Sequence, residues 1–122
     1  MDPCERYREI VRALIKEYAG YKPSRGQIRT EAVVDSEHDH YEVIHVGWEG
    51  GRRVHGTVIH IDIIDGMVWI QHNGTNCPIG EELAAAGIPR EAIVLGFQPP
   101  EVRKYTSFGV GEEVEADAAA TG

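Results

Sequence analysis

Two tight-turn signals lie close together in the middle of the chain, and they constrain its fold more than any other feature. Gly50-Gly51 and Asp65-Gly66 each separate two strand-length apolar runs within residues 39–75. Both dipeptides suit the positive backbone angles of a two-residue type I′ hairpin turn. The sequence therefore predicts three consecutive antiparallel strands whose register is set by the turns.

This register divides the predicted strands into two faces. Centring the turns on those dipeptides pairs Tyr41 with His60 and Asp62 with Trp69, and side chains alternate across a sheet. One face is almost wholly apolar and is predicted to face the core: Ile44, Val46, Trp48, Ile59, Ile61, Ile63, Val68 and Ile70. The other face mixes apolar, aromatic and polar side chains: Tyr41, Val43, His45, Val54, Val58, His60, Asp62, Met67, Trp69 and Gln71.

Helical patterns flank the predicted strands. Asp2-Pro3 is typical of a helix start, and apolar residues then recur at three- and four-residue spacing until Gly20, which predicts an amphipathic helix. A second helix is predicted after Pro78 and should end at Gly87. The first helix is the natural cover for the apolar face of the sheet.

Shorter patterns complete the prediction. Residues 27–35 alternate as a strand does, residues 89–92 predict a short helical turn, and residues 93–97 predict a short apolar strand or extended run. The predicted class is α+β: an antiparallel β-meander of about four to five strands, with the N-terminal amphipathic helix and the second short helix packed on one face.

The size and composition fit one small domain. The chain has 122 residues, of which 42% are hydrophobic, enough for one modest core. We expect a single domain over residues 1–110 and a flexible acidic tail over residues 111–122. Two cysteines, no secretory signal and no membrane-length apolar run predict a cytoplasmic protein with free thiols.

Histidine and carboxylate side chains offer the main candidate chemistry. His60 and Asp62 share a face, which is half of a general-base arrangement, but Thr57 is predicted on the other face and no nucleophile joins them. His38 and His40 have a metal-ligand spacing, yet the predicted register places His40 on the other face of the sheet from His60 and Asp62. The sequence therefore predicts no catalytic residue, no metal site and no cofactor.

The mixed face is instead predicted to be an association surface, because exposed apolar and aromatic patches usually mark one. A second copy of the chain or a protein partner should cover it, and we expect a homo-oligomer. Trp69 would be an anchor whose removal weakens assembly but leaves the fold intact. The predicted interface residues are Tyr41, Val43, His45, Val58, His60, Asp62, Met67, Trp69 and Gln71.

The charge balance disfavours a protein that binds nucleic acid without a partner. The formal net charge is −8, whereas binding to a phosphate backbone usually needs a clustered positive surface. The adjacent basic pairs are Arg52-Arg53 and Arg103-Lys104. These four residues are the candidate contacts if DNA is bound directly.

Three segments of the chain are distinctive: YREIVRALIKEYA at 7–19, DHYEVIHVGWEGGRRVHGTVIHIDIIDGMVWIQHNGT at 39–75 and GIPREAIVLGF at 87–97. Together they resemble the XisI-like proteins, the fdxN element excision controlling factors of cyanobacteria. The most specific pieces are HVGW at 45–48, HIDI at 60–63 and VWIQ at 68–71. The resemblance covers roughly residues 4–109.

The resemblance implies a small accessory protein without catalytic activity. Such a protein acts with an XisH-like partner and is needed when a site-specific recombinase complex excises a DNA element during heterocyst differentiation. The family carries no catalytic motif to transfer to this chain. Two alternatives stay open: an accessory that contacts DNA directly, and a hydrolase that uses His60 and Asp62.

Overall fold

The computed structural model describes residues 3–23 and 26–111. The predicted helix cap at Asp2 and nearly all of the predicted acidic tail, residues 112–122, lie outside the described residues. No helix in the described ranges has the length and apolar character needed to cross a membrane.

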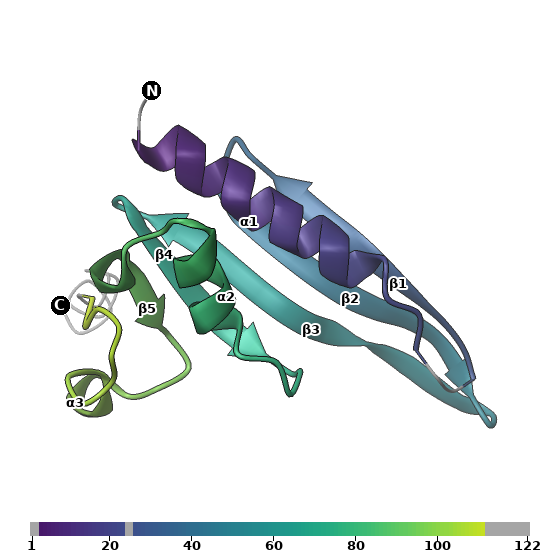
Figure 1. Ribbon diagram of the computed structural model, residues 1–122. Helices are drawn as coiled ribbons and strands as arrows, with labels where there is room; N and C mark the ends of the chain where they lie inside the picture. Colours follow the sequence, from purple (N-terminus) through teal and green to yellow (C-terminus); the bar gives the residue numbers. More distant parts are fainter. Residues whose placement is uncertain (1–2, 24–25, 112–122) are drawn as a thin grey trace, which may run out of the picture.

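The described residues form one long helix, then four consecutive strands, and then several short elements. In chain order these are α1 (Pro3–Ala19), β1 (Gln27–Asp35), β2 (His40–Glu49), β3 (Arg52–Ile64), β4 (Met67–Asn73), α2 (Ile79–Ala86), η1 (Arg90–Ala92), β5 (Ile93–Leu95) and α3 (Pro100–Arg103). The strands form one sheet in the order β1-β2-β3-β4-β5 (Figure 1). The first four strands are antiparallel, and β5 runs parallel to β4. The predicted α+β class is confirmed.

Both predicted hairpin turns are present. Gly50 and Gly51 have φ angles of 55° and 80°, and Asp65 and Gly66 have φ angles of 50° and 78°. Two successive positive φ angles are the backbone signature of a type I′ turn. The turn chemistry therefore fixes where β2, β3 and β4 reverse.

The two longer helices cover the same face of the sheet (Figure 1). α1 lies along β1 and β2, and α2 packs near β5. Tyr18 of α1 donates a hydrogen bond of 2.8 Å to Glu82 of α2, which ties the helices together. Between the helices and the sheet lies the hydrophobic core, whose fully buried members are Val11, Ile15, Tyr41, Val43, Ile59, Ile61, Val68, Ile70, Ile79, Leu83, Ile88 and Ile93.

A β-bulge corrects the predicted register between β2 and β3. Near the turn the pairing is as predicted, with His45 opposite Gly56, but the register shifts between Val43 and Ile44. Val43 pairs with Ile59, so Val58 is the extra residue. A slip of one residue turns every later side chain of one strand to the other face relative to its partner.

The bulge overturns the predicted faces of β2. Tyr41 and Val43 are 0% and 1% exposed in the core under α1, and Val58 packs against that core. His45 and Val54 follow Tyr41 and Val43 to the helix side. The three residues of β2 predicted to be core, Ile44, Val46 and Trp48, point to the opposite face.

The segment that follows β5 folds back on the sheet. Gly109 donates a backbone hydrogen bond of 2.8 Å to Ile93 and forms a bridge beside Val94. On the face away from the helices, Arg103 lies over the ring of Trp69, with 5.0 Å from its guanidinium carbon to the ring centroid. Trp69 is therefore buried by its own chain, at 5% exposure.

Candidate functional site

We call the side of β1, β2 and β3 that faces away from α1 and α2 the open face. No helix lies on it in the described part of the chain (Figure 1). Pairing and side-chain contacts place the following residues on it: Arg29, Glu31 and Val33 of β1; His40, Glu42, Ile44, Val46 and Trp48 of β2; and Arg53, His55, Thr57, His60 and Asp62 of β3.

An apolar strip runs along the open face on β2. It consists of Ile44, Val46 and Trp48, with Val33 of β1 beside it. Trp48 is 53% exposed, and Arg53 lies over its ring at 5.3 Å from the centroid. Charged side chains flank the strip on both sides. This arrangement has an apolar centre and a polar rim, as protein interfaces do.

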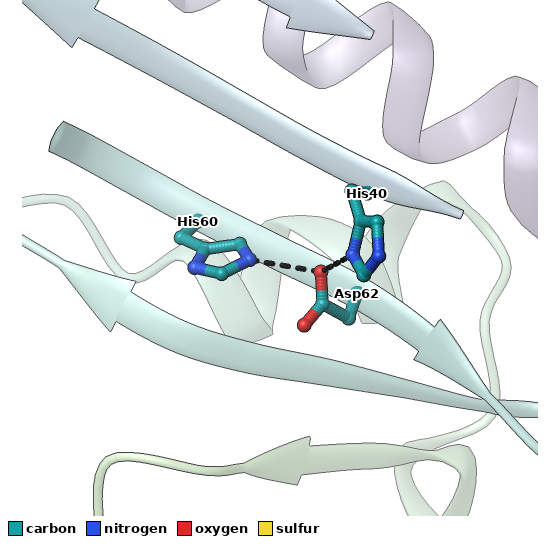
Figure 2. Close-up of side chains that lie close together, drawn as sticks. All are labelled: His40, His60 and Asp62. Atoms are coloured by element: carbon teal, nitrogen blue, oxygen red, sulfur yellow. Dashed lines mark hydrogen bonds and ion pairs between the residues drawn. The ribbon is translucent and has the colours of Figure 1, made fainter. Parts of the chain in front are cut away.

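A compact polar cluster lies at one end of the open face, where β2 begins (Figure 2). His40 Nδ1 and His60 Nε2 each lie 2.8 Å from the same oxygen, Oδ1 of Asp62. Gln71 donates to the other carboxylate oxygen at 3.3 Å. The Asp62 side chain is 10% exposed, whereas the side chains of His60 and His40 are 32% and 59% exposed.

The carboxylate changes the acid–base behaviour of its exposed neighbour. The hydrogen bond to Asp62 raises the pKa of His40 above its ordinary value, and the charges of Asp62, Asp35 and Asp39 act in the same direction. Asp62 thus favours the positively charged form of His40 at the start of β2.

The cluster corrects the argument that excluded a metal site. His40 was predicted on the face opposite His60 and Asp62, but the bulge brings all three together, with one ligand atom from each within 4.8 Å of the others. Imidazole nitrogens and a carboxylate oxygen are common ligands of transition metals.

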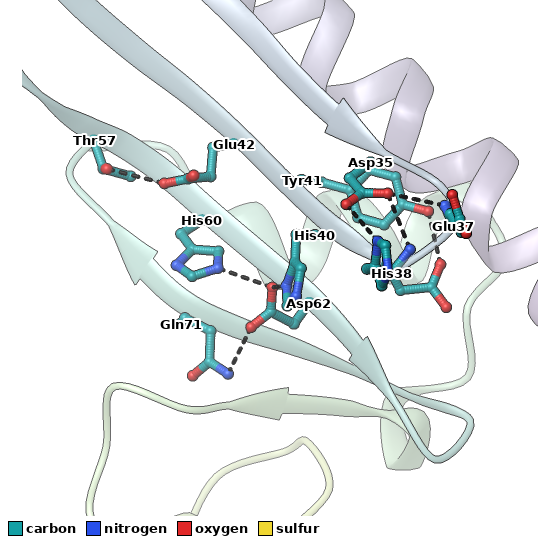
Figure 3. Close-up of polar contacts among 11 residues, drawn as sticks. Asp35, Glu37, His38, His40, Tyr41, Glu42, Thr57, His60, Asp62 and Gln71 are labelled. Carbon is teal, nitrogen blue, oxygen red and sulfur yellow. Dashed lines mark hydrogen bonds and ion pairs between the residues drawn. The ribbon is translucent and has the colours of Figure 1, made fainter.

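The prediction for Thr57 is also wrong. Thr57 shares the open face with His60, but its hydroxyl donates to Glu42 at 3.0 Å, while His60 is bonded to Asp62 (Figure 3). Thr57 and His60 are therefore not joined as a nucleophile and its base.

Sequence reasoning missed a second carboxylate, Asp39, beside this cluster. Arg8 of α1 donates to both of its oxygens at 2.8 and 3.1 Å, and Tyr41 donates at 2.9 Å. Burial opposes ionisation of Asp39, but the hydrogen bonds from Arg8 and Tyr41 outweigh it and lower the pKa. Burial raises the pKa of Tyr41 to about 12, and the hydrogen bond that Tyr41 donates to Asp39 acts in the same direction. Asp39 has a φ angle of 59°, a turn conformation that aspartate tolerates better than most residues, so its residue type is the signal that the sequence offered.

The two basic pairs predicted for DNA contact lie at different ends of the molecule (Figure 1). Arg52 and Arg53 are exposed beside the β2–β3 turn. Arg103, in contrast, is 3% exposed and donates to the carbonyl oxygen of Gln98, which overturns its predicted place on a DNA-contacting surface. Lys104 is exposed beside Tyr105.

Only some of the predicted interface residues lie together on one surface in the structure. His60, Asp62 and Gln71 form the cluster of Figure 2 and its extension in Figure 3. Met67 lies on the same side of the sheet, two residues before the buried Trp69. The contiguous mixed face does not exist as predicted, because four of the predicted interface residues face the helix side. They are Tyr41, Val43, His45 and Val58.

Known proteins share this sheet and helix arrangement. A XisI-like protein from Anabaena variabilis is 43% identical, with a TM-score of 0.81, over 86% of this chain and 96% of that one. The fdxN element excision controlling factor XisI from the same organism is 32% identical, with a TM-score of 0.79, over 90% of this chain and 100% of that one. No curated protein matches the chain. The XisI protein family matches residues 1–110, and the chain belongs to this family.

Proposed function

We propose that this protein is a controlling factor without catalytic activity, which acts by binding an XisH-like protein during site-specific excision of DNA. The family membership and the similarity to a protein known as an excision controlling factor support this proposal. The arrangement of His60 and Thr57, each bonded to a different carboxylate, gives hydrolysis no support.

The open face carries the proposal. Its apolar strip leaves Trp48 53% exposed and Val33 42% exposed. Tryptophan and arginine are enriched among the residues that contribute most of the binding energy in protein interfaces. The strip therefore replaces the mixed face as the contact surface that we propose.

Co-expression with an XisH-like protein, followed by size-exclusion chromatography with light scattering, tests this proposal. We expect a mixed complex that Trp48→Ala weakens by at least tenfold in affinity, the size of effect seen when an interface anchor is truncated. Tyr105→Ala is the matched control, because Tyr105 is 80% exposed but lies in the segment after α3.

Three outcomes would count against the proposal. Absence of any mixed complex would remove the partner, and a homo-oligomer that Trp48→Ala dissociates would assign the open face to self-association. A complex that Trp48→Ala and Tyr105→Ala leave equally strong would place the contact elsewhere on the chain.

Direct contact with DNA is the second candidate, and the exposed turn residues Arg52 and Arg53 favour it. The formal net charge of −8 opposes it. If these arginines bind phosphates, the affinity for duplex DNA should fall steeply with salt, and Arg52→Ala should reduce the slope by about one unit. Binding that does not respond to salt would remove this candidate.

A further inference from the structure

We propose that His40, His60 and Asp62 bind a divalent transition-metal ion, zinc above all. The three side chains come from two neighbouring strands, β2 and β3 (Figure 2). They are brought together by the bulge at Val58, since the unshifted register would place His40 on the other side of the sheet.

The distances suit a metal after a small adjustment. Both imidazole nitrogens lie 2.8 Å from Oδ1 of Asp62, and the three ligand atoms lie within 4.8 Å of one another. Tetrahedral zinc with bonds of roughly 2.0–2.1 Å separates its ligand atoms by about 3.3 Å. An opening of about half an ångström at the two histidine–Asp62 contacts would therefore match this spacing.

The charge of the cluster also favours a cation. Asp62 is 10% exposed, and in the described part of the chain its partners are His40, His60 and Gln71 rather than a lysine or arginine. A nearly buried carboxylate needs a positive partner, and either a protonated His40 or a bound cation can supply one. Asp39, in the same region, has Arg8 as its partner.

The ligand types select the class of ion. Two of the three ligands are imidazole nitrogens, which suit zinc, copper and nickel, whereas magnesium and calcium prefer all-oxygen sites. The exposure of His40, at 59% of its side chain, leaves room for water as the fourth ligand. Gln71 holds the second oxygen of Asp62 at 3.3 Å, as outer-shell partners of metal ligands commonly do.

Calorimetric titration of the tag-free, EDTA-treated full chain with zinc chloride tests the proposal. We expect one zinc per chain. His40→Ala and His60→Ala should each lower the affinity by at least about 10- to 100-fold, because losing an outer-shell partner alone costs that much. His55→Ala is the matched control, since His55 is an exposed histidine on the same face, and it should bind zinc as the unmodified chain does.

Cobalt gives an independent readout. Titration with Co²⁺ should produce the visible absorption bands of a four-coordinate site, and His40→Ala should abolish them. His40 is the safest variant, because its side chain is mostly exposed and its removal should leave the circular dichroism spectrum unchanged. Magnesium chloride at millimolar concentration should give no binding heat.

Two results would overturn the proposal. One is the absence of saturable zinc binding to the unmodified chain at submillimolar concentration. The other is zinc affinity that His40→Ala and His60→Ala leave unchanged, which would place any bound ion at other residues.

Discussion

The two tryptophans of this chain lie on the same side of the sheet and have opposite environments. Each has an arginine over its ring, Arg103 over Trp69 at 5.0 Å and Arg53 over Trp48 at 5.3 Å. Trp69 is 5% exposed and Trp48 is 53% exposed. An arginine–tryptophan pair therefore does not by itself distinguish a packed core element from an available surface.

The difference arises from what else reaches each ring. The backbone of the C-terminal segment passes so close to Trp69 that a Cβ on Gly96 or Gly111 would lie 3.0 or 2.7 Å from the ring. Trp48 lies near the β2–β3 turn on the open face, where no helix lies in the described part of the chain (Figure 1). The chain thus closes one end of this side of the sheet and leaves the other end open.

Truncation of the buried tryptophan should have the largest effect. Trp69→Ala removes a ring that packs against the C-terminal segment, and we expect a loss of about 3–5 kcal/mol in the free energy of unfolding. Urea denaturation followed by circular dichroism measures it. A loss below about 1 kcal/mol would mean that the segment after β5 contributes little, and would return Trp69 to the role of a surface anchor.

Removal of the arginine above each ring should show the same contrast with a smaller effect. Arg103→Ala loses the contact with Trp69 and the hydrogen bond of 3.0 Å to the carbonyl oxygen of Gln98. We expect about 2 kcal/mol of destabilisation, measured by urea denaturation. Arg53→Ala should stay within about 0.5 kcal/mol of the unmodified chain. Equal losses for the two variants would contradict the comparison.

The carboxylate that anchors α1 gives a test that depends on pH. Asp39 has a lowered folded-state pKa, so its contribution is present above the unfolded pKa of about 3.9 and is lost as pH falls through the folded pKa. Asp39→Asn should cost about 1–2 kcal/mol at pH 7. The difference from the unmodified chain should shrink in acid, and urea denaturation at pH 7 and below pH 3 checks this.

Asp35→Asn is the control for that test. Its carboxylate also has a lowered pKa because of hydrogen bonds from His38, but its side chain is 42% exposed. The destabilisation at pH 7 should therefore be smaller than that of Asp39→Asn. The reverse order would show that α1 is not held by Asp39.

Truncation of the exposed tryptophan should change stability least. Trp48→Ala should alter the free energy of unfolding by no more than about 0.5 kcal/mol, because about half of the side chain already contacts solvent. Thermal denaturation measures this directly. A large loss would mean that the apolar strip belongs to the core, as the sequence first suggested.

Local signals predicted most of the architecture. The type I′ turns, the start of α2 after Pro78 and its end at Gly87, which has a φ angle of 124°, all depend on residues within a few positions of one another. The order β2-β3-β4 follows from the two type I′ turns. These features need no knowledge of what packs against what.

The candidate site could not be predicted in the same way, because it depends on one extra residue. The bulge at Val58 has no turn dipeptide or proline to mark it, and it is favoured by the packing of Tyr41 and Val43 under α1. Strict alternation of side chains carries the unshifted register past Val58, and it therefore predicts His40 and Asp62 on opposite faces of the sheet. Arg103 was misplaced for a related reason: its sequence neighbour Lys104 is exposed, and burial of an arginine depends on distant Trp69.

The parallel strand β5 has a consequence for the order of folding. β1 to β4 join through short turns, so their pairing closes only small loops. β5 pairs with β4 only after α2 has crossed over, and the bridge between Val94 and Gly109 needs β5 in place. Because long loops close more slowly than short ones, we expect the C-terminal segment to dock last. Until that step, Trp69 would be as accessible as Trp48, and the newly made chain would expose apolar side chains at both ends of this side of the sheet.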